Sequence, residues 1–372
     1  MLKRAIVLSL GFVLACSGSP NDENDGDDGA ELSSKACSGA ACASLTAPKP
    51  LLRGGVAAVG SELYWIGLGP NGADGQPTDE LQHCTLPACS SVTKLPLVLP
   101  NGKSLRATQL HALGGAGGVF FVGDEPGEFY DGFYTSDGAS FQKVYSGYEN
   151  QHQRYAVDDA GLAVYIADLR TDGWARSTLK NCPWNGLALA QCTAVSDSKL
   201  NHILDIAVTP TRVIATRGTG VNGWDRATLK TMTGVGLSGD GGVSLYTIGE
   251  TEFGATVSIS SHGNKAVHDT AFWIGPKGPN GERYGATVSG VLTATTSTAT
   301  SLYVGTIGEG DVWNVDGVGV VARVSPKGAT SVLAKAQDVH GITVGPTKTY
   351  WLNGVFSGND GNDLGVIRSA KK

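Results

Sequence analysis

The sequence lacks sustained helical periodicity in its body, and only 17% of its 372 residues are charged. The motifs GxSxG and HExxH are absent as well, so the sequence indicates neither a serine-hydrolase nucleophile elbow nor a zinc-protease helix. Glycine, with 53 residues, is abundant. Low charge and many glycines are typical of a β protein rich in turns, and we therefore expect an all-β fold.

A concentrated basic patch is also missing. The chain has 28 Lys and Arg, and removing Lys3 and Arg4 with the N-terminal segment leaves 26 against 34 acids. Six of those acids lie in residues 17–31, so the body has 26 bases against 28 acids. Nucleic-acid binding needs clustered Lys and Arg to displace counterions. The near-neutral body therefore argues against nucleic acid as a partner.

The N-terminus has the pattern of an export signal. Lys3 and Arg4 precede an apolar run from Ala5 to Leu14, which is too short to span a bilayer, since a spanning helix needs about 20 residues. Val13-Leu14-Ala15-Cys16 resembles the lipobox of bacterial lipoproteins. The resemblance implies cleavage after residue 15 and palmitate-type lipid on Cys16, and the alternative is an ordinary signal peptide with a chance cysteine. Ser17 favours the outer membrane or cell surface over the inner membrane.

An acidic, polar segment follows the lipid-anchored cysteine. Residues 16–45 contain a Ser/Asn/Asp/Gly run that cannot form an apolar core, so we predict a disordered tether. Its like charges favour an extended chain. A calcium site between Asp22 and Asp28 is the alternative, although nothing rigid would organise its ligands. The folded domain is predicted over residues 46–372.

The other six cysteines form sequence-local pairs. An oxidising compartment favours disulfides, and locality favours the pairs Cys37–Cys42, Cys84–Cys89 and Cys182–Cys192. A metal site built from Cys84, Cys89 and His83 is the alternative for one of them.

Two internal repeats indicate the architecture. Gly173 to Lys180 recurs as Gly223 to Lys230 with six of eight residues identical. A looser unit combines short strands, a Gly/Asn/Asp loop and an adjacent aromatic or branched pair. The pairs begin at Tyr64, Phe120, Tyr165, Val213, Phe272, Tyr303 and Tyr350. Their mean spacing of about 48 residues is the size of a four-stranded propeller blade.

Seven such units predict a seven-bladed β-propeller, with six or eight blades as alternatives. The spacing between pairs is uneven at one place: 59 residues separate Val213 from Phe272, and only 31 separate Phe272 from Tyr303. Either the fifth blade is truncated or the fourth and fifth divide differently. The chain ends soon after Arg368, so the last blade has three strands of its own. We predict that the segment after Cys42 supplies the fourth and closes the ring.

The repeat, the lipobox and the hairpin cysteines together resemble the loosely defined group of bacterial β-propeller lipoproteins. The segments Ala58 to Gly67 and Thr343 to Gly354 carry the resemblance best, and it covers roughly residues 50–370. It implies a fold and no particular chemistry. The aromatic pairs are expected on second strands, packed in the core between blades.

Long glycine-rich segments follow these pairs and are predicted to join second and third strands on one face. Loops on a rigid scaffold are where binding sites tend to lie. Trp174, Trp224 and Trp313 are therefore candidate binding residues, with the start of a third strand as the alternative. Asp360 and Asp363 are weak calcium candidates in a single Gly/Asn/Asp turn. No cofactor is otherwise expected.

The predicted function is that of a membrane-anchored, monomeric binding module for an unknown protein or glycan, rather than that of an enzyme. One alternative is a lyase or hydrolase acting on glycan or peptide, with residues from several loops at the channel mouth. Another is an outer-membrane assembly or scaffold subunit. No catalytic residue is assigned from the sequence.

Overall fold

The computed structural model describes the body of the chain in fifteen segments. These are residues 43–45, 49–125, 131–146, 152–158, 163–169, 178–195, 203–217, 220–232, 244–248, 251–262, 265–274, 284–307, 319–337, 339–355 and 364–372. Their regular structure consists of 29 strands, and these segments contain no helix. The prediction of an all-β fold is confirmed. Within the same segments no helix is long and apolar enough to cross a membrane.

The strands form successive antiparallel units. Unit 1 is β2 (Lys49–Val59), β3 (Glu62–Asn71), β4 (Pro77–Thr85) and β5 (Thr93–Pro96). Unit 2 is β6 (Arg106–Leu113), β7 (Gly118–Asp124), β8 (Asp131–Ser136) and β9 (Phe141–Ser146). Unit 3 is β10 (His152–Val157), β11 (Ala163–Leu169), β12 (Thr178–Asn185), β13 (Ala188–Leu189) and β14 (Thr193–Ala194). Unit 4 is β15 (Ile203–Val208), β16 (Arg212–Arg217), β17 (Gly220–Asp225) and β18 (Thr231–Met232).

The second half of the chain continues the pattern. Unit 5 is β19 (Ser244–Ile248), β20 (Thr251–His262), β21 (Lys265–Ile274) and β22 (Tyr284–Ser289). Unit 6 is β23 (Val291–Ser297), β24 (Leu302–Ile307), β25 (Gly319–Val324) and β26 (Thr330–Gln337). Unit 7 is β27 (Val339–Val344), β28 (Lys348–Val355) and β29 (Leu364–Lys371), with β1 (Ala43–Ser44) beside β29.

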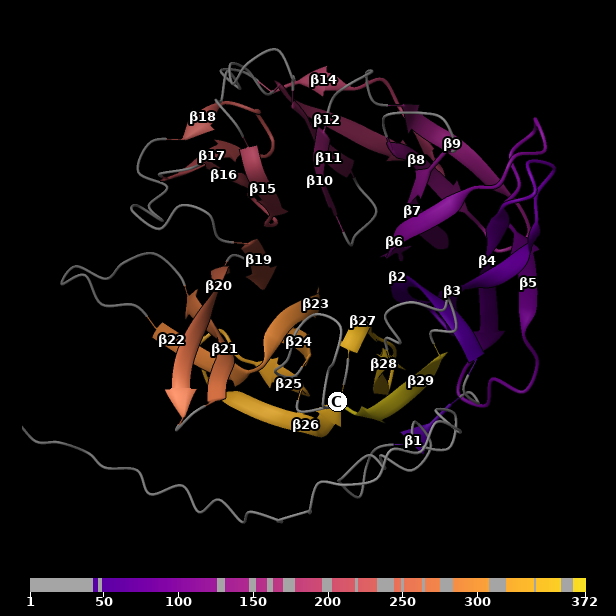
Figure 1. The fold of residues 1–372 in the computed structure, drawn as a ribbon. Helices are drawn as coiled ribbons and strands as arrows, with labels where there is room; N and C mark the ends of the chain where they lie inside the picture. The colour runs from indigo at the N-terminus through magenta and orange to yellow at the C-terminus, as the bar shows by residue number, and fades with distance from the viewer. Residues whose placement is uncertain are drawn as a thin grey trace, which may run out of the picture.

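The units are arranged in a ring (Figure 1). The first strand of each unit lies nearest the centre and the fourth lies at the periphery. Each unit is an up-and-down antiparallel meander, so the turns between first and second strands share one face with those between third and fourth strands. The connections between second and third strands lie on the opposite face. We call these the hairpin face and the loop face.

The ring closes through the N-terminal part of the chain. β2 pairs with β3 through Val56–Val59 and with β29 through Lys49 and Pro50, so units 7 and 1 share one eight-stranded sheet. β1 adds two pairs with β29, and the Leu45 N–H donates to the Ile367 carbonyl oxygen at 2.7 Å. The prediction that the segment after Cys42 completes the last unit is confirmed. The sheet begins at Ala43, which lies inside the predicted tether of residues 16–45.

The central aromatic and branched pairs are core residues, as expected. Tyr64 packs towards unit 2 and Trp65 towards unit 7, and both side chains are buried. Tyr350 and Trp351 likewise pack on opposite sides, towards units 1 and 6. Adjacent strand residues point to opposite faces of a sheet, so each pair joins its unit to both neighbours.

Unit 5 departs from the predicted placement. Phe272 and Trp273 lie on β21, the third strand, whereas the pairs of the other units lie on second strands. The unit has four strands and is not truncated. Its second strand alternates Val257, Ser258 and Ile259, so it carries no adjacent large apolar pair. In unit 5 the conspicuous pair therefore marks the third strand instead of the second. This displacement explains the uneven spacings of 59 and 31 residues between the pairs of units 4, 5 and 6.

Candidate functional site

The predicted binding loops lie mainly outside the described residues. Seven residues with a predicted role also lie outside the described residues: Cys16, Cys37, Cys42, Trp174, Trp313, Asp360 and Asp363. Six of the seven predicted segments do join second and third strands, but the one after Phe272 joins β21 to β22, the third and fourth. The first loop is described in full. In it Asp74 accepts bonds from the Ser104 N–H and hydroxyl at 3.1 and 2.9 Å, so this turn is fixed to the link between units 1 and 2.

Trp224 is not a binding-loop residue. It lies within β17, between Val213 of β16 and Thr231 of β18, and only 1% of its surface is exposed. It packs in the core cluster that joins units 3 and 4. The alternative given by the sequence, a tryptophan at the third strand, is correct here because an indole of this size gains most by burial between two sheets.

Two of the three predicted disulfides are present. Cys84–Cys89 links the end of β4 to the following turn, and Cys182–Cys192 spans the β12–β13 hairpin. The first packs with Leu45 and Ile367 at the ring closure. The second holds the hairpin whose Leu187 carbonyl oxygen accepts a bond from Thr135 of unit 2. Each disulfide thus fixes a turn that leans on the preceding unit, and the alternative of a Cys84/Cys89/His83 metal site is wrong.

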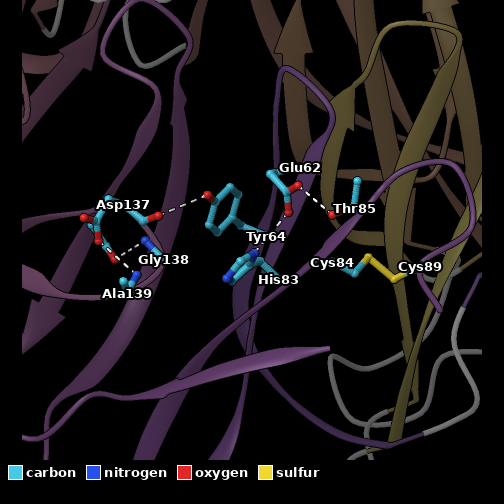
Figure 2. A network of polar contacts seen from close by, with 10 residues as sticks. Glu62, Tyr64, His83, Cys84, Thr85, Cys89, Asp137, Gly138 and Ala139 are labelled. Carbon is cyan, nitrogen blue, oxygen red and sulfur yellow. Dashed lines mark hydrogen bonds and ion pairs between the residues drawn. A yellow bond between two sulfur atoms is a disulfide. The ribbon is translucent and has the colours of Figure 1, made fainter. Parts of the chain in front are cut away.

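A half-buried histidine and a carboxylate meet on the hairpin face (Figure 2). His83 Nδ1 lies 3.1 Å from Glu62 Oε2, and the Thr85 hydroxyl donates to Glu62 Oε1 at 2.8 Å. Since a carboxylate only accepts hydrogen bonds, Nδ1 carries the proton in this contact. The Tyr64 ring stacks on the imidazole with centroids 5.0 Å apart.

The hairpin register explains this cluster. Glu62 lies opposite Thr85, and Tyr64 lies opposite His83, on adjacent antiparallel strands. Residues directly and diagonally opposite on one face of such a pair lie within side-chain reach. The sequence gives no local signal for the Glu62–His83 contact, because 21 residues separate the two side chains. Aligning Tyr64 with His83 across the predicted hairpin would have brought the two together.

The next unit covers the far side of His83. The Asp137-Gly138 turn between β8 and β9 approaches from unit 2 (Figure 2). Gly138 has φ +92°, and a Cβ there would lie 3.0 Å from His83 Nε2. The N–H groups of Ser140 and Ala139 donate to Asp137 and lower the pKa of its carboxyl. The cluster can orient an imidazole, and Gly138 of unit 2 lies beside its Nε2.

Two further contacts of buried carboxylates join neighbouring units. Asp79 Oδ2 accepts the Ala107 N–H at 2.6 Å, which ties β4 to β6. Burial raises the pKa of Asp79 to about 6, against the opposing effects of the Ala107 bond and the Arg106 charge. Asp158 of unit 3 pairs with Arg226 of unit 4. Across the described segments no group of three or more His, Cys, Asp or Glu side chains is placed to hold a metal ion.

Comparison with known proteins identifies the fold. No family model matches the chain, and no curated protein sequence matches it. Among solved structures, the β-propeller domain of the Trilobed protease from Pyrococcus furiosus aligns with a TM-score of 0.53 at 10% identity, over 84% of this chain and 91% of that one. An oligogalacturonate lyase in complex with manganese aligns with a TM-score of 0.56 at 11% identity, over 90% and 94%. U3-55K aligns with a TM-score of 0.51 at 8% identity, over 89% and 99%.

Proposed function

This chain folds as a β-propeller, and we propose that it is an exported, lipid-anchored binding protein. Its ring of sheets holds a ligand-binding surface on the loop face, and lipid on Cys16 attaches it to the outer membrane or cell surface. The ligand is a protein or a glycan.

The observation that supports a binding scaffold is how the described charged side chains are used. Asp79 holds the start of β6, and Asp158 pairs with Arg226 between units. Glu125 is bonded by Lys143 and by the Tyr134 hydroxyl. Buried or half-buried charges tied to neighbouring strands hold a frame rigid, and a rigid frame lowers the entropy that its surface loses on binding.

Photo-cross-linking tests the binding face. A photoreactive amino acid in place of exposed Gln76, in the turn between β3 and β4, probes the loop face of the full-length chain in its native cells. The matched control is exposed Thr300, in the β23–β24 turn on the hairpin face. We expect a defined adduct from position 76 and none from position 300. Adducts only from position 300, or none from either, would contradict the proposal. A membrane complex cross-linked at both faces would instead indicate a scaffold subunit.

One specific contact favours a second function, that of a propeller hydrolase or lyase. The Glu62–His83 pair is a carboxylate-oriented imidazole, which is the arrangement that a general base requires. Glycan and peptide panels should then release product at a rate that falls at least about a hundredfold in His83→Gln, the size of a typical general-base contribution. Equal product release by wild type and His83→Gln would exclude His83 from catalysis.

A further inference from the structure

The innermost strands share an irregularity that the repeat did not reveal. In five units the ladder between first and second strands is interrupted on the first strand. The interruptions lie between Leu51 and Val56, Ala107 and Gln109, Ile203 and Asp205, Leu292 and Ala294, and Val339 and Gly341. Such β-bulges re-aim side chains and are common at rims of barrels and beside binding sites.

Three of these bulges lie at one height in the ring. In units 2, 6 and 7 the bulge faces two residues of the second strand. These two residues directly follow the central pair, which ends at Phe121 in unit 2, Val304 in unit 6 and Trp351 in unit 7. The second strands run from these pairs towards the loop face. The bulges therefore lie between the core and the loop-side mouth of the channel.

Neighbouring bulges touch one another around one side of the channel. The Thr293 hydroxyl of β23 donates to the Val339 carbonyl oxygen of β27. A Cβ on Gly341 of β27 would lie 2.4 Å from the Gly55 Cα of β2. A Cβ on Gly55 would in turn lie 3.7 Å from the Leu110 carbonyl oxygen of β6. Units 6, 7, 1 and 2 thus form a continuous wall at this height.

The wall presents uncharged polar groups to the channel. Thr293 of unit 6 and Thr108 and Gln109 of unit 2 are exposed, whereas His340 of unit 7 is half-buried and its Nε2 is covered. An innermost strand has a neighbouring unit on each side, so a side chain exposed there faces the channel or its mouth. Between them unit 1 contributes Gly54 and Gly55, which have no side chains. We call Thr108, Gln109, Thr293 and Gly55 the mouth arc.

We infer that the mouth arc binds a saccharide, an inference that rests on the proposed binding function and assigns its ligand class. Hydroxyl and amide groups at one height match a sugar ring, which carries hydroxyls around its edge. An added peptide strand would need an uninterrupted row of backbone donors and acceptors. The bulges break that row on each strand of the wall, so the geometry favours the sugar.

Calorimetric titration of the full-length chain in detergent micelles tests the inference with maltopentaose, cellopentaose and chitopentaose. We expect at least one to bind with a Kd below about 1 mM. Thr108→Val removes a hydroxyl at nearly constant volume and should weaken that binding about five- to tenfold, the value of one hydrogen bond. The matched control is Thr287→Val, at an exposed threonine on outer strand β22, and it should bind as wild type does.

Hydrogen exchange with the same sugar locates the site. Protection of the amides of residues 107–110, 292–295 and 339–341 supports the mouth arc. Protection elsewhere together with unchanged binding by Thr108→Val would overturn it, and the bulges would then serve only to relieve crowding where the inner strands converge. Absence of binding by all three sugars would also overturn it. The proposed function is judged separately by the adduct at position 76, which any ligand class can give.

Discussion

Asp79 and His111 make opposite contributions to stability between about pH 4 and 6.5. Burial raises the pKa of Asp79 from 3.8 to about 6. Its protonated form is therefore favoured in the folded state, and the stability it contributes is present below pH 3.8 and is lost as the pH rises through 6. Two units of pKa correspond to about 3 kcal/mol.

His111 has the reverse dependence. Burial lowers its pKa from 6.5 to about 4. Its Nε2 lies 3.2 Å from the Tyr155 hydroxyl, which itself donates to Gln109, and the ring contacts Phe120. The folded state thus disfavours the imidazolium, so stability is present above pH 6.5 and is lost as the pH falls towards 4. The loss is at most about 3 kcal/mol.

Single variants separate the two effects. Asp79→Asn keeps an acceptor for the Ala107 N–H and removes the titration, so its stability relative to wild type should increase by up to about 3 kcal/mol from pH 4 to 6.5. His111→Gln removes the titrating imidazole, so the stability of this variant should fall less steeply than that of wild type between pH 6.5 and 4, with a difference of up to about 3 kcal/mol. Urea unfolding followed by tryptophan fluorescence at half-unit pH steps measures both. Curves that run parallel to wild type for both variants would refute the assigned burial of these groups.

Other expected outcomes concern packing, disulfides and anchoring. Gly341→Ala places a Cβ 2.4 Å from the backbone of β2 and should cost about 1–3 kcal/mol in urea unfolding, whereas Gly285→Ala, with no atom nearer than 3.6 Å, should change it little. From loop length alone, replacing Cys84–Cys89 by alanines should cost about 2 kcal/mol and replacing Cys182–Cys192 about 3; equal or reversed losses would show that chain entropy does not dominate. Cys16→Ala should abolish labelling by an alkyne fatty acid and yield a folded soluble body, and an unfolded variant would contradict the separation of tether and propeller.

The sequence predicted the parts of the fold that depend on local alternation. Adjacent large apolar residues such as Tyr64 and Trp65 mark a strand buried on both faces, and six of the seven pairs lie on second strands. The eight-residue repeat was less informative. Leu179 lies in β12, whereas its counterpart Leu229 lies in a turn with φ +55°. Sequence identity over eight residues therefore does not fix structural equivalence when strand lengths differ between units.

The candidate sites depend on strand bounds, hairpin register and the packing of units. The alternation of apolar and polar residues along a strand contains none of these. Trp224 looked like a loop residue because glycines precede it, yet β17 begins at Gly220 and buries it. The Glu62–His83 contact depends on hairpin register, and the mouth arc depends on where inner strands from distant parts of the chain converge. Bulges have no sequence signature beyond a glycine such as Gly55, so only the three-dimensional arrangement reveals them.

The ring closes next to the point in the sequence where the acidic N-terminal segment meets the propeller. The acidic segment ends before Ala43, and the next residues already pair with Arg368 and Ser369 of the last strand. Leu45 then packs beside the Cys84–Cys89 turn. If lipid on Cys16 anchors the chain, tension on the tether acts first on β1 and its few bonds to β29. The apolar contacts of Leu45 add to those bonds. The Cys84–Cys89 disulfide therefore fixes a turn at the place where an anchored propeller would be pulled.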